Sequence, residues 1–173
     1  AALDDLQVML RQLRAQAAPL RIDAHRIAVL GASAGGQLAG LLAARVGDGQ
    51  ADAVISVAGP WNLTDTSMPA PAAAPGILRN LFGGPPTAQQ LAAESPTLLV
   101  PADGSFVPTL FIHGAADTLV PASQSIQACA RMGRACAFGR ALIVDTSPRA
   151  NAHDAMLLLQ SRWDDVVRFM AAF

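Results

Sequence analysis

Five residues, Gly31-Ala32-Ser33-Ala34-Gly35, join an apolar run to a helix-forming stretch, and this junction constrains the fold more than any other part of the sequence. The run 26–30 before it predicts a buried strand, and the stretch 37–45 after it predicts a helix. A G-x-S-x-G pattern in that context is typical of a nucleophile elbow, a sharp turn that holds a serine above the end of a parallel strand. Side chains two positions before or after the serine are expected to collide with the neighbouring strand or helix. An ordinary glycine-rich turn is the alternative.

The remaining sequence alternates predicted strands with predicted helices. Short apolar runs without polar alternation predict strands that are buried on both faces, at residues 26–30, 52–58, 108–113 and 140–145. Helical spacing predicts helices at residues 3–17, ending before Pro19, at about 34–46, 87–94 and 121–132, and in a last segment from Met156 to Met170. This order predicts one α/β domain over residues 1–173. The predicted domain has three layers, a parallel sheet of four strands with helices on both faces.

Residues 59–107 interrupt this alternation and contain most of the twelve prolines of the chain. A connection of that length in a compact α/β unit is more often a lid or a pocket wall than a plain linker, although a passive surface loop is the alternative. Trp61, Leu63 and Phe82 are the predicted substrate-pocket residues, and Met68, Ile77 and Leu78 extend the same apolar wall. An apolar wall of this kind suits small uncharged ligands.

Composition excludes several classes of function. The formal net charge of -1 gives no electrostatic basis for binding nucleic acid or an acidic membrane surface. All twelve basic residues are arginines, which excludes a phosphate-loop lysine and a Schiff-base lysine. Glu94 is the single glutamate, so a helical H-E-x-x-H zinc site is excluded, and the three histidines lack metal-like spacing. We therefore expect no metal and no cofactor.

Two further expectations concern compartment and redox state. The sequence shows no secretory signal and no apolar run of membrane-spanning length, so we expect a soluble protein located in the cytoplasm. Cys129 and Cys136 are the two cysteines, and they flank the predicted end of a helix at Gly133. Two buried thiols are the expected state and a disulfide is the alternative.

A serine hydroxyl becomes a good nucleophile when a histidine removes its proton and a carboxylate orients that histidine. In the chain order serine, acid, histidine, Asp117 fits the second place because it follows the strand 108–113 by a short turn and precedes a new helix. A carboxylate that only makes turn hydrogen bonds is the alternative for Asp117. Asp145 and Asp154 are rival acids: the first ends a strand without a turn, and the second adjoins the candidate base.

His153 is the candidate base because it lies in the loop between the last predicted strand and the last helix. His25 precedes its strand, which places it at the opposite edge of the sheet. His113 ends a strand within Ile112-His113-Gly114, where a buried structural imidazole is the expected role.

The run from Ile22 to Ala39, with S-A-G-G after the strand, resembles the corresponding stretch of hormone-sensitive-lipase-like and related carboxylesterases of the α/β-hydrolase superfamily. Further matches in order are Gly59-Pro60, Phe82-Gly83-Gly84, Ser95-Pro96, His113-Gly114 with Asp117, and Val120-Pro121. The resemblance covers nearly the whole chain, and Ala34 after the serine favours esterases over oligopeptidase relatives. It implies Ser33 as nucleophile, Asp117 as acid and His153 as base.

The sequence departs from this family in two places. Asp154-Ala155 follows His153, where the family usually has glycine and an aromatic residue. The family also has an H-G-G-G-type oxyanion loop some 70 residues before the serine, whereas 32 residues precede Ser33 here. The chain thus resembles the carboxyl-terminal two thirds of such a domain, a truncated or reduced α/β-hydrolase fold. The backbone N–H of Ala34 remains as one oxyanion donor, so we expect low activity unless Gly36, a lid residue or a partner chain supplies another.

These observations favour a serine carboxylesterase that hydrolyses short acyl esters of small molecules through an acyl-enzyme on Ser33. The rival hypothesis is a non-catalytic hydrolase remnant that binds a small ligand or a partner subunit, and a peptidase is a third. In a chain lacking the amino-terminal strands, the strand 26–30 becomes a sheet edge. We expect a homodimer or the helix 3–17 to cover that edge.

Overall fold

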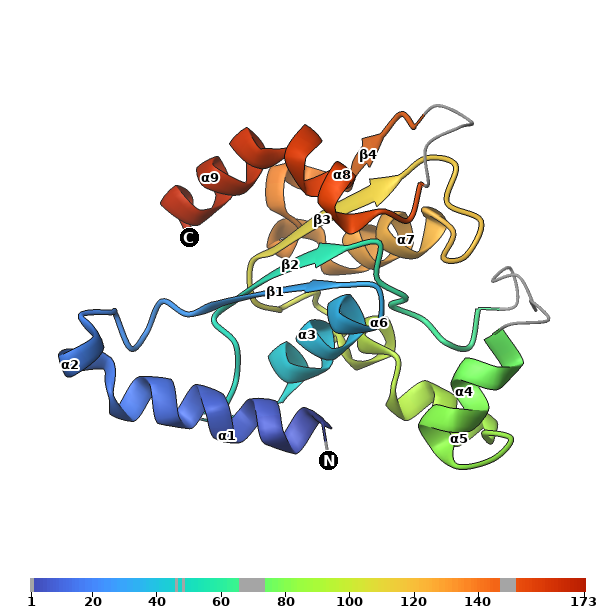
Figure 1. Ribbon diagram of the computed structural model, residues 1–173, viewed down its shortest axis with the longest axis horizontal. Helices are drawn as coiled ribbons and strands as arrows, with labels where there is room; N and C mark the ends of the chain where they lie inside the picture. Colours follow the sequence, from blue (N-terminus) through green and yellow to red (C-terminus); the bar gives the residue numbers. More distant parts are fainter. Residues whose placement is uncertain (1, 46, 48, 66–73, 147–151) are drawn as a thin grey trace.

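Four parallel strands form the centre of the computed structural model, which describes residues 2–45, 47, 49–65, 74–146 and 152–173 (Figure 1). The strands are β1 (Ala28–Ala32), β2 (Ala53–Val57), β3 (Thr109–Gly114) and β4 (Leu142–Val144), and they lie in the order β1-β2-β3-β4. Every residue of β2 and β3 is buried. The prediction of a four-stranded parallel sheet is confirmed. The predicted burial on both faces holds for β2 and β3, whereas β1 and β4 are only partly buried.

Helices cover both faces of the sheet. They are α1 (Ala2–Ala15), α2 (Ala17–Leu20), α3 (Ala34–Ala44), α4 (Ala74–Phe82), α5 (Ala88–Ala93), α6 (Pro96–Leu99), α7 (Ser123–Met132), α8 (Ala155–Ser161) and α9 (Trp163–Ala172), with short 3-10 turns η1 (Gly133–Ala135) and η2 (Ala137–Gly139). One core cluster joins α1, α3 and α7 to one face of the sheet, and a second cluster joins α8 and α9 to the other face. The three-layer α/β architecture is therefore confirmed (Figure 1).

Alternation along β3 decides which side chains meet which helix layer. Successive side chains of a strand point to opposite faces. Phe111 packs in the cluster that contains α3 and α7, whereas Leu110 and Ile112 pack in the cluster that contains α8 and α9. His113 shares the parity of Phe111 and therefore faces α7, a placement on which the site described below depends.

Several boundaries differ from the predicted ones. Strand β1 begins two residues later than predicted and continues through Gly31 and Ala32, so the turn starts only at Ser33. The amino-terminal helix ends at Ala15, and a separate short helix α2 includes Pro19. Proline is tolerated there because the first turn of a helix needs no N–H bond from that residue. The last predicted helix is divided at Arg162 into α8 and α9.

The two cysteines form a disulfide, so the expectation of two free thiols is wrong. Cys129 lies near the end of α7, and the chain reverses at Gly133, which has a φ of 55°, a left-handed conformation that glycine adopts readily. The reversal brings Cys136 to a Cα–Cα distance of 5.1 Å from Cys129. The pairing depends on this turn after the helix, which spacing in the sequence does not reveal.

We expect removal of this disulfide to lower the free energy of unfolding by about 2–3 kcal/mol, because the bridge closes a short loop in the unfolded chain. The Cys129→Ala/Cys136→Ala double variant and the reduced wild-type protein should lose the same amount in denaturant titrations. A stability equal to that of the oxidised protein would contradict a structural role for the bridge.

Strand β1 forms one edge of the sheet, as predicted, and Leu30 on it is 45% exposed. Of the two expected covers, helix α1 does not run along this edge. Its Leu10 packs with Leu42 of α3 on one face of the sheet, and α1 lies beneath α3 in Figure 1. A homodimer through the β1 edge stays a prediction. No helix in the described part of the chain is both long and apolar enough to cross a membrane.

Candidate active site

Ser33 occupies a strained turn between β1 and α3. Its φ of 51° and ψ of -124° lie outside the conformations that side chains favour, at a cost of about 1–3 kcal/mol. Gly31 makes the turn possible, because a Cβ there would lie 2.1 Å from the backbone oxygen of Gly35. The strained serine backbone and the need for glycine two positions before it are both as predicted.

The expectation for the second glycine of the motif is wrong. A Cβ added at Gly35 would meet nothing within 4 Å, whereas one at Gly36 would lie 2.7 Å from Ser56 Oγ and 3.1 Å from Gly59 Cα. The helix start therefore packs against the end of β2 through Gly36. The Gly36 N–H donates to the Ser33 carbonyl at 2.9 Å, so this group is already occupied and does not supply the expected second oxyanion donor.

Asp117 follows β3 by a short turn and is held by it. Its Oδ1 accepts the N–H groups of Leu119 and Val120, both at 2.9 Å, and its side chain is fully buried. Asp117 therefore makes the turn hydrogen bonds of its alternative role and also contacts His153. His153 approaches because Gly114 has no side chain: a Cβ there would lie 2.1 Å from the Ala152 oxygen.

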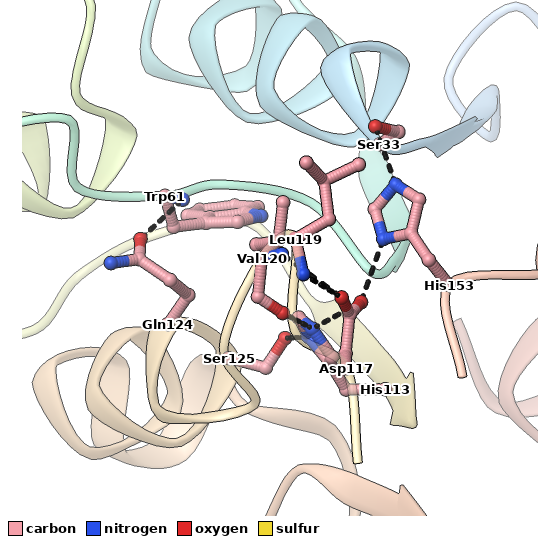
Figure 2. A network of polar contacts seen from close by, with 9 residues as sticks. All are labelled: Ser33, Trp61, His113, Asp117, Leu119, Val120, Gln124, Ser125 and His153. Carbon is pink, nitrogen blue, oxygen red and sulfur yellow. Dashed lines mark hydrogen bonds and ion pairs between the residues drawn. The ribbon is translucent and has the colours of Figure 1, made fainter. Parts of the chain in front are cut away.

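Ser33, His153 and Asp117 form a continuous hydrogen-bonded chain at the carboxyl ends of β1, β4 and β3 (Figure 2). His153 Nδ1 lies 2.6 Å from Asp117 Oδ2, and His153 Nε2 lies 2.8 Å from Ser33 Oγ. An ionised carboxylate only accepts, so Nδ1 carries the proton of the neutral ring. Nε2 then has a free lone pair, and the Ser33 hydroxyl donates to it.

The rival residues lie elsewhere. Asp145 is exposed after the end of β4, and Asp154 caps α8 by accepting the N–H groups of Met156 and Leu157. His25 is exposed in the turn before β1, at the opposite end of the strands from Ser33. Of the candidate acids and bases, the structure brings Asp117 and His153 to the serine.

The environment of Asp117 favours its ionised form. Burial opposes ionisation, but hydrogen bonds from His113 and His153 and from the Val120 N–H outweigh it. The pKa of Asp117 therefore lies well below its ordinary value of 3.8. The carboxylate stays charged at neutral pH and can stabilise a positive charge on His153.

This lowered pKa predicts a loss of stability in acid. A depressed pKa in the folded state stabilises the protein above the unfolded value of 3.8, and the contribution is lost as pH falls from there through the folded pKa. Denaturant titrations between about pH 6 and about pH 3 should show a smaller acid-induced loss for Asp117→Asn than for the wild type. Equal losses in the two proteins would contradict this assignment.

A cavity of about 220 Å³ adjoins Ser33 and Ala34. Its other described walls are mainly apolar and come from the start of α1, from α3, from the segment 59–107 and from the turn after Asp117. They are Ala2, Gln37, Leu38, Pro60, Leu63, Leu78, Leu81, Glu94, Leu119 and Val120. The predicted pocket residue Leu63 and the predicted wall residue Leu78 therefore line this cavity. Part of the segment 59–107 forms a pocket wall beside the serine.

Two other predicted pocket residues lie outside this cavity lining. Trp61 is 0% exposed, so the prediction that it contacts substrate is wrong. Its Nε1–H donates to Ser56 Oγ at 2.8 Å and its ring packs edge-on against Phe111, because α3 leaves room for a large side chain at Gly40. Phe82 ends α4 and is not among the residues that line the cavity. Met68 lies outside the described residues.

Gln124 is a residue at this site that the sequence analysis missed. It is 1% exposed in the first turn of α7, and its Oε1 accepts the N–H group of Trp61 at 2.9 Å (Figure 2). The same oxygen accepts the N–H group of Asn62 at 2.7 Å. Its Nε2 donates to Asp65 Oδ2 at 3.0 Å. Gln124 thus holds the segment that carries Pro60 and Leu63. Its position in an amphipathic helix gives no signal of this, because the partners are about sixty residues away in sequence.

Ala34 is the first residue of α3, so no carbonyl of the helix precedes it to accept its N–H. Ala34 also lines the cavity beside Ser33. Within the described ranges, no cluster of three or more His, Cys, Asp or Glu side chains is arranged to hold a metal ion.

Comparisons with solved structures match this fold. The chain aligns with a bifunctional GH43-CE protein of Bacteroides eggerthii (TM-score 0.75, 24% identity), covering 98% of this chain and 24% of that one. It aligns with a truncated carbohydrate esterase from gut microbiota (0.72, 23%), covering 98% and 68%. It also aligns with Thermogutta terrifontis esterase 2 phosphoramylated by tabun (0.65, 22%), covering 96% and 63%. The chain therefore spans between a quarter and about two thirds of these proteins.

No curated protein matches the sequence. A family model, BD-FAE, matches residues 1–132, which is most of the chain and includes Ser33 and Asp117. The expectation of an α/β-hydrolase is confirmed, and the finer likeness to hormone-sensitive-lipase-like enzymes stays a prediction. The chain belongs to the BD-FAE family and has an α/β-hydrolase fold.

Proposed function

We propose that the protein is a serine carboxylesterase with Ser33 as nucleophile, His153 as general base and Asp117 as the acid that orients the base. The observation that carries this proposal is the unbroken hydrogen-bonded chain from Ser33 Oγ through His153 to Asp117, beside an apolar cavity. The likeness to an esterase that tabun phosphoramylates supports a reactive serine in this fold. Neighbours described as carbohydrate and acetyl ester hydrolases support ester chemistry.

The proposed reaction has two stages. Ser33 Oγ attacks the acyl carbon while its proton passes to His153 Nε2, and the resulting imidazolium is stabilised by Asp117. The tetrahedral intermediate collapses, the C–O bond to the alcohol breaks, and His153 returns the proton to the leaving oxygen. Water then attacks the acyl-enzyme by the same path, which releases the acid and restores the Ser33 hydroxyl.

The negative oxygen of the tetrahedral intermediate needs hydrogen-bond donors. The Ala34 N–H is the one we assign from this chain, at the start of α3. The H-G-G-G-type loop of the hormone-sensitive-lipase-like enzymes does not occur within residues 1–173. Since loss of one donor costs about 10²–10³ in rate, the source of a second donor decides how fast the proposed enzyme turns over its substrate.

Covalent labelling is the sharpest test because it does not need fast turnover. A fluorophosphonate should add its phosphonyl group to Ser33, which a peptide mass measurement locates. Ser33→Ala should not be labelled, whereas Ser105→Ala, a substitution at an exposed turn serine, should be labelled like the wild type. A folded wild type that stays unlabelled would contradict the proposal and favour a ligand-binding hydrolase remnant.

We propose that the substrates are esters with short, uncharged acyl groups. The cavity beside Ser33 is small and mostly apolar, with Glu94 as its one acidic side chain among the described lining residues. A cavity of this size accommodates a short acyl group and excludes a long fatty acyl chain. The negative charge of Glu94 disfavours acyl groups that carry a carboxylate.

Chain-length preference tests this assignment. Among acetate, butyrate and palmitate esters of one chromophore, kcat/KM should be highest for acetate or butyrate and lower by about tenfold or more for palmitate, because extra methylene groups find no room. Leu78→Ala removes part of the wall and enlarges the cavity, so it should raise the relative rate for longer esters. Leu98→Ala, outside the cavity, is the matched control. A clear preference of the wild type for palmitate would contradict a short acyl pocket.

A further inference from the structure

His113 is a buried titratable side chain that the proposed reaction does not use. Its side chain is 0% exposed, and it lies on the far side of Asp117 from His153 (Figure 2). Nε2 of its ring is 2.8 Å from the Val120 carbonyl oxygen and 3.4 Å from Asp117 Oδ2. Nδ1 is 2.7 Å from Ser125 Oγ of α7. The ring therefore joins α7 to the turn that carries Asp117.

The partners decide where the ring proton lies. A backbone carbonyl can only accept, so the proton is on His113 Nε2, and this N–H donates to Val120. In the neutral ring Nδ1 then accepts, and the Ser125 hydroxyl donates to it. Ser125 thereby favours the tautomer whose Nε2–H points to Val120 and lies near Asp117 Oδ2. That oxygen is the one that accepts the hydrogen bond of His153.

The turn from Asp117 to Val120 is bonded to β3 at its start, where the Asp117 N–H donates to the Gly114 carbonyl at 3.3 Å. Asp117 Oδ1 accepts two N–H groups from within the turn, which shapes the turn but does not anchor it to the sheet or to α7. The bond from His113 to the Val120 carbonyl supplies such an anchor, because His113 is a residue of β3. Leu119 and Val120 of the same turn line the cavity.

We propose that His113 and Ser125 are a positioning pair that sets Asp117 Oδ2 in line with His153 Nδ1. This inference rests on the proposed function, in which Asp117 is the acid. His113 does not touch the substrate or the reacting atoms; it acts by fixing the turn through Val120 and by directing a proton toward Asp117. The pair controls the length and direction of the hydrogen bond between Asp117 Oδ2 and His153 Nδ1, which is 2.6 Å long.

The direct readout is the proton of the His153–Asp117 bond. In protein with ¹⁵N-labelled histidine, a proton held in a short charge-assisted bond gives a far-downfield resonance. His113→Phe removes the donor and should abolish this resonance or move it markedly upfield. His113→Gln keeps an amide N–H near the position of Nε2 and should retain it. A folded His113→Phe protein with an unchanged resonance would overturn the proposal.

Kinetics provide a second readout that a purely structural role would not move. Rates are normalised to the number of sites that react with fluorophosphonate, so partial unfolding does not lower them. His113→Phe should lower kcat by about 10- to 100-fold with a smaller change in KM, because misplacement of a catalytic group slows the chemical step. His113→Gln should recover most of that loss. His25→Phe, at an exposed histidine, is the control and should behave like the wild type.

Ser125→Ala keeps the proposal testable if His113→Phe does not fold. It removes only the hydroxyl that favours the tautomer, so the resonance should shift and kcat should fall by a smaller factor, about threefold to tenfold. No change in either quantity would overturn the role of the pair. Failure of the proposed function is seen separately, as an unlabelled Ser33 in the wild type, because the resonance of the His153–Asp117 bond needs no catalytic activity.

Discussion

Ser33→Ala should lower ester hydrolysis by about 10³-fold or more. The substitution removes the one oxygen that lies 2.8 Å from His153 Nε2 and leaves the imidazole without a nucleophile to activate. Alanine meets the same backbone strain as serine at this position, so the variant should fold. The measurement is steady-state hydrolysis of a chromogenic acetate or butyrate ester.

The control for this experiment is Ser105→Ala, whose hydroxyl only bonds the Asp103 side chain in an exposed turn. It should keep wild-type activity and stability within error. If Ser33→Ala retained the wild-type rate, the hydrolysis would come from surface groups or a contaminant, and Ser33 would not be the nucleophile.

Asp117→Asn should lower kcat by about 10⁴-fold, or to the detection limit, while leaving the fold intact. Asn keeps an oxygen that can accept the N–H groups of Leu119 and Val120, so the turn is preserved. Its NH₂ group replaces the oxygen that faces His153 Nδ1, and it donates where the carboxylate accepted. The imidazole then carries its proton on Nε2 and cannot accept the proton of Ser33.

Asp145→Asn is the matched control, because Asp145 follows β4 but lies exposed to solvent. It should retain full activity. A small effect of Asp117→Asn together with a large effect of Asp145→Asn would reverse the assignment of the acid. Fluorophosphonate labelling of Ser33 should be slowed in Asp117→Asn as well, since attack on phosphorus needs the same base.

The convergence of Ser33, Asp117 and His153 could be predicted because it follows from their order along the chain. Each residue was expected in a loop after a buried parallel strand, and the carboxyl ends of parallel strands lie at one edge of a sheet. The hydrogen bonds observed among them agree with that expectation. Their proposed catalytic roles await the experiments above.

The sequence predicts less well which side chains lie in the core and which line the cavity. Trp61 was expected in a pocket wall because apolar residues of a long connection can face either substrate or core, and periodicity does not distinguish the two. The space beside Gly40 and the hydrogen bond to Ser56 place its ring in the core. His113 was expected as a structural imidazole, and its link to Asp117 depends on the contact between β3 and α7.

The sequence by itself determined the strand–turn–helix around Ser33, the four parallel strands and the chain order of serine, acid and histidine, because these follow from hydrophobic periodicity and from glycine at a tight turn. The tertiary structure alone decided the Cys129–Cys136 disulfide, the burial of Trp61 and the convergence of Ser125 and His113 on the turn of Asp117. The physical reason is that these features depend on tertiary packing. Local patterns record what a residue's neighbours in sequence require, whereas these contacts depend on how helices pack on the sheet and on where the chain reverses after α7.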